Sequence, residues 1–358
     1  MEQVTLHNNF TAFWNKKIKV TYILSVLVCI LHVYAYKNYT FGDDLISKIN
    51  SVFVFALRDV LPPVAVPLFF IISGYAFFRN FTIKKYPQKL KSRIRTLLIP
   101  YLIWNTIWML FQFAVSYSPV SQYFVGRGKL ELNVLNVFLS IFHWKANGPF
   151  WFVFNLMVFM IASPLIYYLM KNRYVGIISI IAIIILLQFD FGIPESIFLE
   201  KDSIIYFMFG AMLGIHFKKQ FSEHSKKTEM VIYTVLFVVS CGLTVVYKAD
   251  MLLYGKGVYA LVRLFFAFTF WKMYDWYYKG QSVHPYEKRS FMVFAMHLNI
   301  VAVISKLIYL LLPKNNIFVI PNTIVTIVLT LVIINWFCVF MERFFPKIYS
   351  VISGSRSG

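Results

Sequence analysis

The sequence contains few charged residues, and acidic residues are the scarcest of them. Only 14% of the 358 residues are charged, whereas 59% are hydrophobic and the mean hydropathy is +0.67. A soluble domain carries more charge and far fewer long apolar runs. The composition therefore excludes an ordinary soluble enzyme and indicates a chain that folds within a lipid bilayer.

Cysteine is also rare. Each of the three cysteines, Cys29, Cys241 and Cys338, lies inside an apolar run, and they form no CxxC spacing. Isolated cysteines in such runs are typical small hydrophobic core residues. The sequence therefore predicts neither a disulfide framework nor a metal site.

Apolar stretches recur along the whole chain, and many have the length of about twenty residues at which a helix crosses a bilayer. We predict an all-α, polytopic integral membrane helical bundle with about ten transmembrane helices. The predicted spans are 18–36, 60–78, 96–117, 148–170, 174–189, 204–217, 230–247, 256–274, 290–312 and 321–341. Residues 1–345 would form a single transmembrane domain, and residues 346–358 a short cytoplasmic tail.

The net charge of +20 is explained by the loops between these spans. With alternate loops on alternate sides, the side that holds both termini collects more than twice as many Lys and Arg residues as the other. Cytoplasmic loops of membrane proteins are enriched in these residues. Both termini are therefore predicted to be cytoplasmic, and the positive charge does not indicate nucleic-acid binding.

Three ionisable residues lie well inside predicted spans: His32, Arg263 and His297. Such residues cost at least about 2.5 kcal/mol each on insertion scales, and they commonly face a cavity or a partner. From a rise of about 1.5 Å per residue, His32 and Arg263 should lie at nearly the same depth. A shared polar cavity is one interpretation, and a hydrogen bond between helices is the alternative for each histidine.

A run of basic residues, "KKYPQKLKSRIRTLLIPYLIW", leads into the third predicted span. Its candidates for binding a cofactor are Lys89, Lys91, Arg93 and Arg95. Arginine holds phosphate oxygens through bidentate contacts, which favours a site for a phosphorylated cytosolic ligand. A basic collar on anionic lipid headgroups is the alternative, and the sequence alone leaves both open.

The segment "GPFWFVFNLMVFMIASPLI" begins at the external face with a Gly-Pro break. Trp151 lies at the interface, and Asn155 follows one turn deeper on the same helix face. An aromatic ring beside an amide could bind a sugar. An interfacial anchor and a packing residue are the alternative interpretations.

Six segments carry a resemblance to a known family. They are "SVLVCILHV", "VPLFFIISGYAFF", "RIRTLLIPYLIW", "GPFWFVFNLMVF", "YFMFGAMLGIHFKK" and "SFMVFAMHLNIV". In this order, across nearly the whole chain, they resemble the membrane acyltransferase-3 family of bacterial O-acyltransferases that act on cell-envelope or exported glycans. The resemblance implies transfer of an acyl group, usually acetyl from acetyl-CoA, to a glycan hydroxyl.

The resemblance also implies roles for individual residues. His32 would be the catalytic histidine, and Arg93 matches the first arginine of a pair that serves the acyl donor. His297 and Trp151 match further positions of the family pattern. The chain departs from this pattern at Thr21 and Thr96, where family members carry arginine.

Together these features predict a multi-pass O-acyltransferase of the bacterial inner (plasma) membrane, with acetyl-CoA or another acyl-CoA as co-substrate and no metal. Its partners would be the lipid bilayer and a glycan or lipid-linked sugar acceptor, without nucleic acid. His32 would act as a general base or accept the acyl group itself, and Arg263 would stabilise the oxyanion. A transporter or flippase of lipid-linked sugars or small polar solutes, or a non-catalytic partner of polysaccharide synthesis, are the alternatives.

Overall fold

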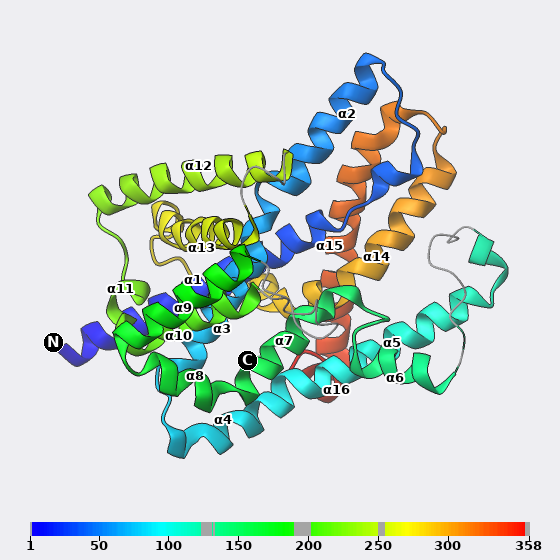
Figure 1. The fold of residues 1–358 in the computed structure, drawn as a ribbon. Coiled ribbons are helices and arrows are strands. Elements are labelled where there is room, and N and C mark those ends of the chain that lie inside the picture. The colour runs from blue at the N-terminus through cyan, green and yellow to red at the C-terminus, as the bar shows by residue number, and fades with distance from the viewer. Residues whose placement is uncertain (1, 123–130, 132, 190–201, 250–254, 355–358) are drawn as a thin grey trace. The chain divides into compact units, whose positions relative to one another are not determined.

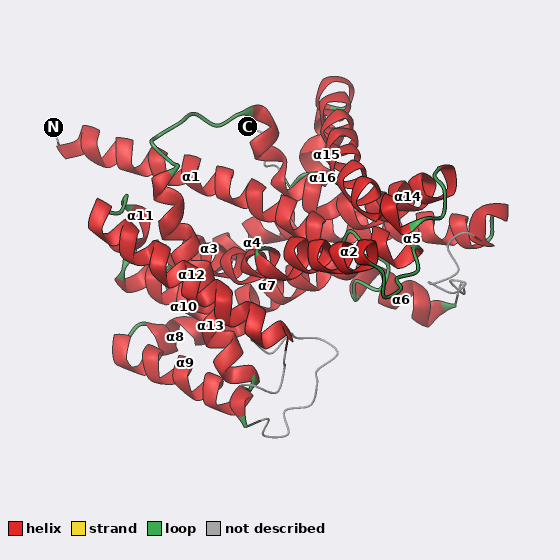
Figure 2. Cartoon of the chain, turned by 90° about the horizontal axis from the view of Figure 1, so that it is seen from above, coloured by secondary structure: helices red, strands yellow, loops and turns green. Residues whose placement is uncertain are grey.

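The computed structural model describes residues 2–122, 131, 133–189, 202–249 and 255–354. Every regular element in these ranges is a helix, and Figure 2 shows no strand among them. The predicted all-α class is therefore confirmed for the described part of the chain. The chain divides into two compact units. The first comprises Met1–Leu27, Leu57–Leu90 and Val158–Lys288, and the second comprises Val28–Ala56, Lys91–Met157 and Arg289–Gly358.

The first unit is built around a cluster of aromatic side chains. Its helices are most of α1 (Glu2–Leu31), α3 (Ala65–Phe78), most of α4 (Tyr86–Arg93), α8 (Ser163–Met170), α9 (Arg173–Gln188), α10 (Ser203–His216), α11 (Lys218–Ser222), α12 (Lys227–Ala249) and α13 (Lys256–Met273). In Figure 1, α12 lies along α13, against which it packs. The rings of Phe13, Tyr75, Phe221 and Trp271 meet with centroids 4.6 to 6.3 Å apart. These contacts join α1, α3, α11 and α13.

Helices α3 and α10 pack so closely that their backbones touch. Gly210 and Gly214 are four residues apart on α10 and face α3. A Cβ at Gly210 would collide with the carbonyl oxygen of Ile71, and a Cβ at Gly74 would collide with that of Phe207. Small residues at this spacing are common where membrane helices approach each other closely. The glycines of the "SGY" and "FGAMLG" segments therefore have a packing role.

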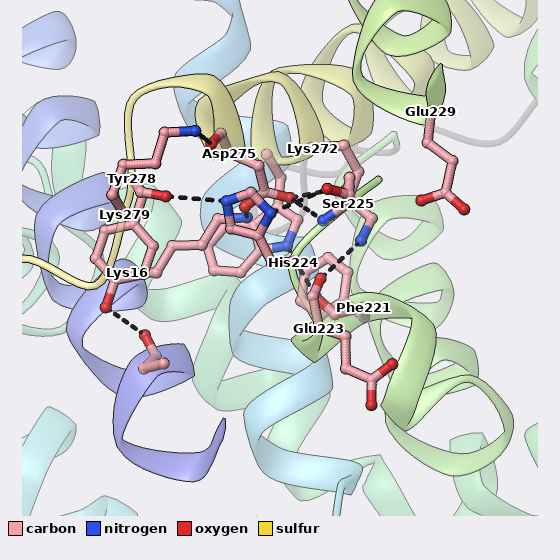
Figure 3. Close-up of polar contacts among 12 residues, drawn as sticks. Lys16, Phe221, Glu223, His224, Ser225, Glu229, Lys272, Asp275, Tyr278 and Lys279 are labelled. Carbon is pink, nitrogen blue, oxygen red and sulfur yellow. Dashed lines mark hydrogen bonds and ion pairs between the residues drawn. The ribbon is translucent and has the colours of Figure 1, made fainter. Parts of the chain in front are cut away.

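A buried ion pair ties the middle of α1 to the turn after α13, as Figure 3 shows. Lys16 Nζ donates to Asp275 Oδ1 at 2.5 Å and lies 4.2 Å from the Trp271 ring centroid. The other carboxylate oxygen accepts from the backbone N–H and the hydroxyl of Ser225, at 3.0 and 2.9 Å. Burial by itself would raise the pKa of Asp275, but Lys16 and Ser225 together lower it below its ordinary value.

Further polar contacts extend this network. Lys19 Nζ donates to both carboxylate oxygens of Glu287 at 3.0 Å, and both side chains are nearly buried. Lys272 Nζ donates to the carbonyl of Gln220 at 2.6 Å. His224 Nε2 bonds the carbonyl of Tyr278 at 3.0 Å. Lys16 and Lys19, in the middle of α1, are therefore each held by a specific acidic partner in the first unit.

The second unit contains the C-terminal helices. It comprises α2 (Leu45–Phe55), α5 (Ile99–Ser116), α6 (Val134–Phe142), most of α7 (Trp151–Ile161), α14 (Ser290–Leu311), α15 (Val319–Phe344) and α16 (Pro346–Ile352). Helix α14 packs against α15, and α5 packs against α6 and α16. The Trp104 indole N–H donates to the carbonyl of Ile352 at 3.0 Å. The segment predicted as a tail thus begins with a packed helix, and its last residues, 355–358, lie outside the described ranges.

Every predicted span coincides with a helix or a helix pair, but span 148–170 is broken. Its two halves, α7 and α8, are bent by 66° at Ala162. Pro164, in the first turn of α8, has no N–H to continue the helical hydrogen bonds, which explains the break. The structure also adds α2 and α6, which the sequence analysis placed in loops.

The helices support a multi-pass membrane protein. Among the described residues, six helices are long and apolar enough to cross a bilayer, or seven if the bent pair α7–α8 is one span. Helices α9 and α10 have 16 and 14 residues. At about 1.5 Å per residue, they fall short of a hydrocarbon core about 30 Å thick. The number of ten spans therefore stays a prediction.

Candidate functional site

His32 lies directly after the end of α1. The first predicted span placed it inside a helix that continues to residue 36, but α1 ends at Leu31 and His32 occupies the following turn. Cys29 and Val33, on either side of His32, pack in a small apolar cluster with Val301 of α14 and Ile327 of α15. This packing fixes the turn against the second unit's C-terminal helices and leaves the imidazole half-buried.

The tautomer of His32 follows from its hydrogen bond. Its Nδ1 lies 2.8 Å from the carbonyl oxygen of Val28. A carbonyl oxygen only accepts, so Nδ1 must carry the proton in the neutral ring. The lone pair of the neutral imidazole is therefore on Nε2. This is the protonation state that a general base requires.

His297 faces the same turn from α14. Its ring centroid is 5.1 Å from that of His32. Its Nδ1 bonds the carbonyls of Phe294 and Val293 at 2.8 and 3.2 Å, so its lone pair is also on Nε2. The side chain is fully buried, and Nε2 has no hydrogen-bond partner in the described structure. Two histidines that are far apart in the sequence thus lie side by side, and the lone pair of each ring, when neutral, is on Nε2.

The segment after the Gly-Pro break packs one turn before His297. Phe150 stacks on Phe294 with parallel rings 5.7 Å apart, and the Phe294 ring is 6.1 Å from that of His297. Helix α7 begins immediately afterwards with a partly exposed Trp151, and Asn155, one turn later, is fully buried. Both predicted substrate-binding residues of α7 therefore belong to the same unit as the histidine pair.

The sequence analysis missed a row of polar side chains on α5. Asn105, Trp108 and Gln112 recur at helical spacing on this helix. The Trp108 indole N–H donates to the carbonyl of Ala295 at 2.8 Å, and Gln112 Nε2 donates to that of Ala146 at 2.7 Å. Two amides seven residues apart in an apolar helix were the signal that could have identified this face.

Arg263 lies in the first unit. Its guanidinium donates to Asp202 Oδ2 at 2.8 Å and lies 5.7 and 5.5 Å from the ring centroids of Tyr206 and Tyr259. The positive charge that the sequence left without a partner is therefore neutralised by a carboxylate. Its role in stabilising an oxyanion stays a prediction.

The predicted phosphate-binding residues are divided between the two units. Lys89 belongs to the first unit, where its ammonium group bonds the carbonyl of Phe77. The second unit contains the other three, Lys91, Arg93 and Arg95. The side chains of Lys91 and Arg95 are exposed. Arg93 is half-buried, its Nε has no hydrogen-bond partner, and no described carboxylate pairs with it. Among the four residues, Arg93 has a buried donor atom that lacks a hydrogen-bond partner, and its role in binding a phosphate stays a prediction.

The two threonines at the departing positions bond their own helices. Thr21 Oγ1 donates to the carbonyl of Ile18, and Thr96 Oγ1 donates to that of Ser92. Neither side chain can supply the charge of an arginine.

The described residues contain no group of three or more His, Cys, Asp or Glu side chains that could hold a metal ion.

Comparisons with known proteins match most of the chain. A family model described as an acyltransferase domain matches residues 22–341. The chain is also 29% identical over 170 residues to the succinoglycan biosynthesis protein ExoH of Rhizobium meliloti. That alignment covers 45% of this chain and 43% of the relative, which is less than half of each. No solved structure matches the chain.

Proposed function

Because residues 22–341 show that the chain belongs to the acyltransferase-domain family, we propose that it is a membrane O-acyltransferase acting on a glycan. The donor would be acetyl-CoA or another acyl-CoA, and the acceptor a hydroxyl of a cell-envelope or extracellular glycan. The similarity to a succinoglycan biosynthesis protein supports a polysaccharide acceptor. The observation that carries the proposal is the pairing of His32 with His297, 5.1 Å between ring centroids.

The proposed reaction begins with proton removal by His32. Its Nε2 accepts the proton of the acceptor hydroxyl, and the oxygen attacks the thioester carbonyl carbon. The C–S bond then breaks, and the proton passes from the imidazolium to the leaving thiolate of coenzyme A. The bond from Nδ1 to the Val28 carbonyl would keep the ring orientated through both proton transfers. In its neutral form, the buried His297 would add no positive charge that opposes protonation of His32.

The direct test uses the glycans of the cell envelope. Membranes that contain the protein should transfer label from acetyl-CoA into glycan, and mass spectrometry should find one acyl mass per modified residue. A strain without the protein should lack that mass. Movement of sugars across the membrane without acylation would instead support the transporter alternative.

We further propose that Arg93 binds a phosphate of the acyl-CoA donor. Replacing Arg93 with glutamine should weaken coenzyme A binding about tenfold, as expected for one charge-assisted hydrogen bond of about 1.5 kcal/mol. Titration calorimetry on the purified protein measures this affinity. Arg173, an exposed arginine 5.0 Å from the Tyr174 ring, provides the matched control. Equal affinities for the wild type and Arg93→Gln would contradict this assignment.

The proposed topology has ten spans, with both termini cytoplasmic in the bacterial inner membrane. The excess of Lys and Arg on one set of loops supports it. Reporter fusions after each predicted span measure the side on which each loop lies. An external signal from fusions at residues 80–95 would contradict the topology, because this basic loop should be cytoplasmic.

A further inference from the structure

Three side-chain atoms that accept hydrogen bonds but do not donate them are buried among the described residues of the second unit without a partner. They are Asn105 Oδ1, Asn147 Oδ1 and His297 Nε2. All three side chains are 0% exposed, and none of these atoms has a partner in the described structure. Buried polar atoms are rarely left in this state in folded proteins. Three such atoms in one unit therefore require an explanation.

The orientation of both amides is fixed by their neighbours. Asn105 Nδ2 donates to the carbonyl of Ile141 at 3.0 Å, and Asn147 Nδ2 donates to that of Ala295 at 3.3 Å. Turning either amide would bring two acceptor oxygens together, so the unpaired atom is in each case the amide oxygen. The lone pair of His297 is fixed by the same argument. All three atoms therefore need donors.

Hydrogen bonds to the carbonyl of Ala295 connect the segments that carry these three residues. Asn147 Nδ2 and the Trp108 indole both donate to the carbonyl of Ala295. Asn105 precedes Trp108 by one turn of α5, and His297 follows Ala295 by two residues on α14. These bonds thus form a junction of α5, the segment before α7 and α14. His297 also belongs to the histidine pair.

The chemistry of the junction favours a neutral ligand with several hydroxyl groups. Acceptors without an adjacent charge bind O–H donors, and adjacent hydroxyl groups of a sugar supply more than one. A thioester carbonyl, in contrast, offers only an acceptor and cannot satisfy them. The half-buried His32 would meet one hydroxyl while the buried amides hold its neighbours.

We propose that Asn105, Asn147 and His297 form the binding site for the acceptor glycan, an inference that rests on the proposed acyltransferase function. Asn147 Oδ1 accepts from a hydroxyl adjacent to the one that His32 deprotonates. The site recognises the sugar by its donors, and Arg93 serves the acyl donor separately.

The test compares transfer with stability in the variant Asn147→Leu. With labelled acetyl-CoA and native membranes, transfer into glycan should fall about tenfold, as expected for one lost neutral hydrogen bond to substrate. The Tm of the purified variant should stay the same or rise, because leucine removes a buried acceptor that has no partner. Coenzyme A affinity should be unchanged.

Two further variants make the result decisive. Asn105→Leu should lower transfer to the same extent, and it serves if Asn147→Leu does not fold. Its Tm should fall, because the carbonyl of Ile141 loses its donor. Thr330→Val is the matched control, because Thr330 Oγ1 is also buried without a partner but lies on α15. It should leave transfer unchanged. The inference would be overturned if both asparagine variants transferred at the wild-type rate. It would also be overturned if their coenzyme A affinity fell as much as their transfer. Absence of transfer by the wild type would instead contradict the proposed function.

Discussion

Replacement of His32 by alanine is expected to lower acyl transfer at least about 100-fold, the range of a positioned general base. The chain folds so that His32 Nδ1 is occupied by the Val28 carbonyl and Nε2 is left as the basic atom. Alanine removes this base while the apolar contacts of Cys29 and Val33 with α14 and α15 remain. The loss should therefore appear in the rate of transfer and not in stability.

The measurement is the initial rate of label transfer from acetyl-CoA into glycan in membranes with equal amounts of each variant. His216 is the matched control, because its Nε2 also bonds a backbone carbonyl, that of Met170, at 2.7 Å. His216→Gln should transfer at nearly the wild-type rate. If His32→Ala also kept the wild-type rate, His32 could not be the base, and the proposed mechanism would have to be abandoned.

The largest loss of stability is expected from Asp275→Ala. This change leaves the ammonium group of Lys16 buried beside Trp271 without its carboxylate, and both side chains of the ion pair are at most 5% exposed. Removing one partner of a buried ion pair typically costs about 3–5 kcal/mol. The loss should appear as a large decrease in the Tm of the purified protein. Lys219→Ala is the control, because the exposed Lys219–Glu223 pair should contribute less than about 1 kcal/mol.

The double variant Lys16→Met with Asp275→Leu separates charge from packing. Apolar replacements of both partners leave no buried charge, so the double variant should recover most of the lost Tm.

Acid should also weaken the ion pair between Lys16 and Asp275. The pKa of Asp275 is lower in the folded protein than its ordinary value, so this stabilisation is present above the ordinary value and is lost as the pH falls through the lowered one. If Asp275→Ala were as stable as the wild type, the Lys16–Asp275 pair would contribute little to stability.

The apolar runs were sufficient to predict most of the long helices of the structure, although α2 and α6 were missed. Hydropathy is a local property of the chain, and a backbone in lipid must satisfy its own hydrogen bonds, so long apolar segments become helices. The same segments carried the family resemblance that the match over residues 22–341 confirms. His32 and His297 were also found individually, because an ionisable residue is conspicuous in an apolar run.

Contacts between residues that are far apart in the sequence could not be predicted from these local patterns. The pairing of the two histidines, the Lys16–Asp275 ion pair and the neutralisation of Arg263 by Asp202 each join residues on different helices. No local pattern specifies which faces of two helices meet. The unpaired oxygens of Asn105 and Asn147 were also not predictable, because only the neighbours of an amide in space show which of its atoms lacks a partner.

The amino-acid sequence by itself determined that this is a helical membrane protein of the acyltransferase type, with a histidine at the end of its first apolar segment. The tertiary structure decided that this histidine meets His297, and that the lone pair of each ring is on Nε2. The physical reason is that helix formation depends on neighbours along the chain, whereas side-chain chemistry depends on neighbours in space.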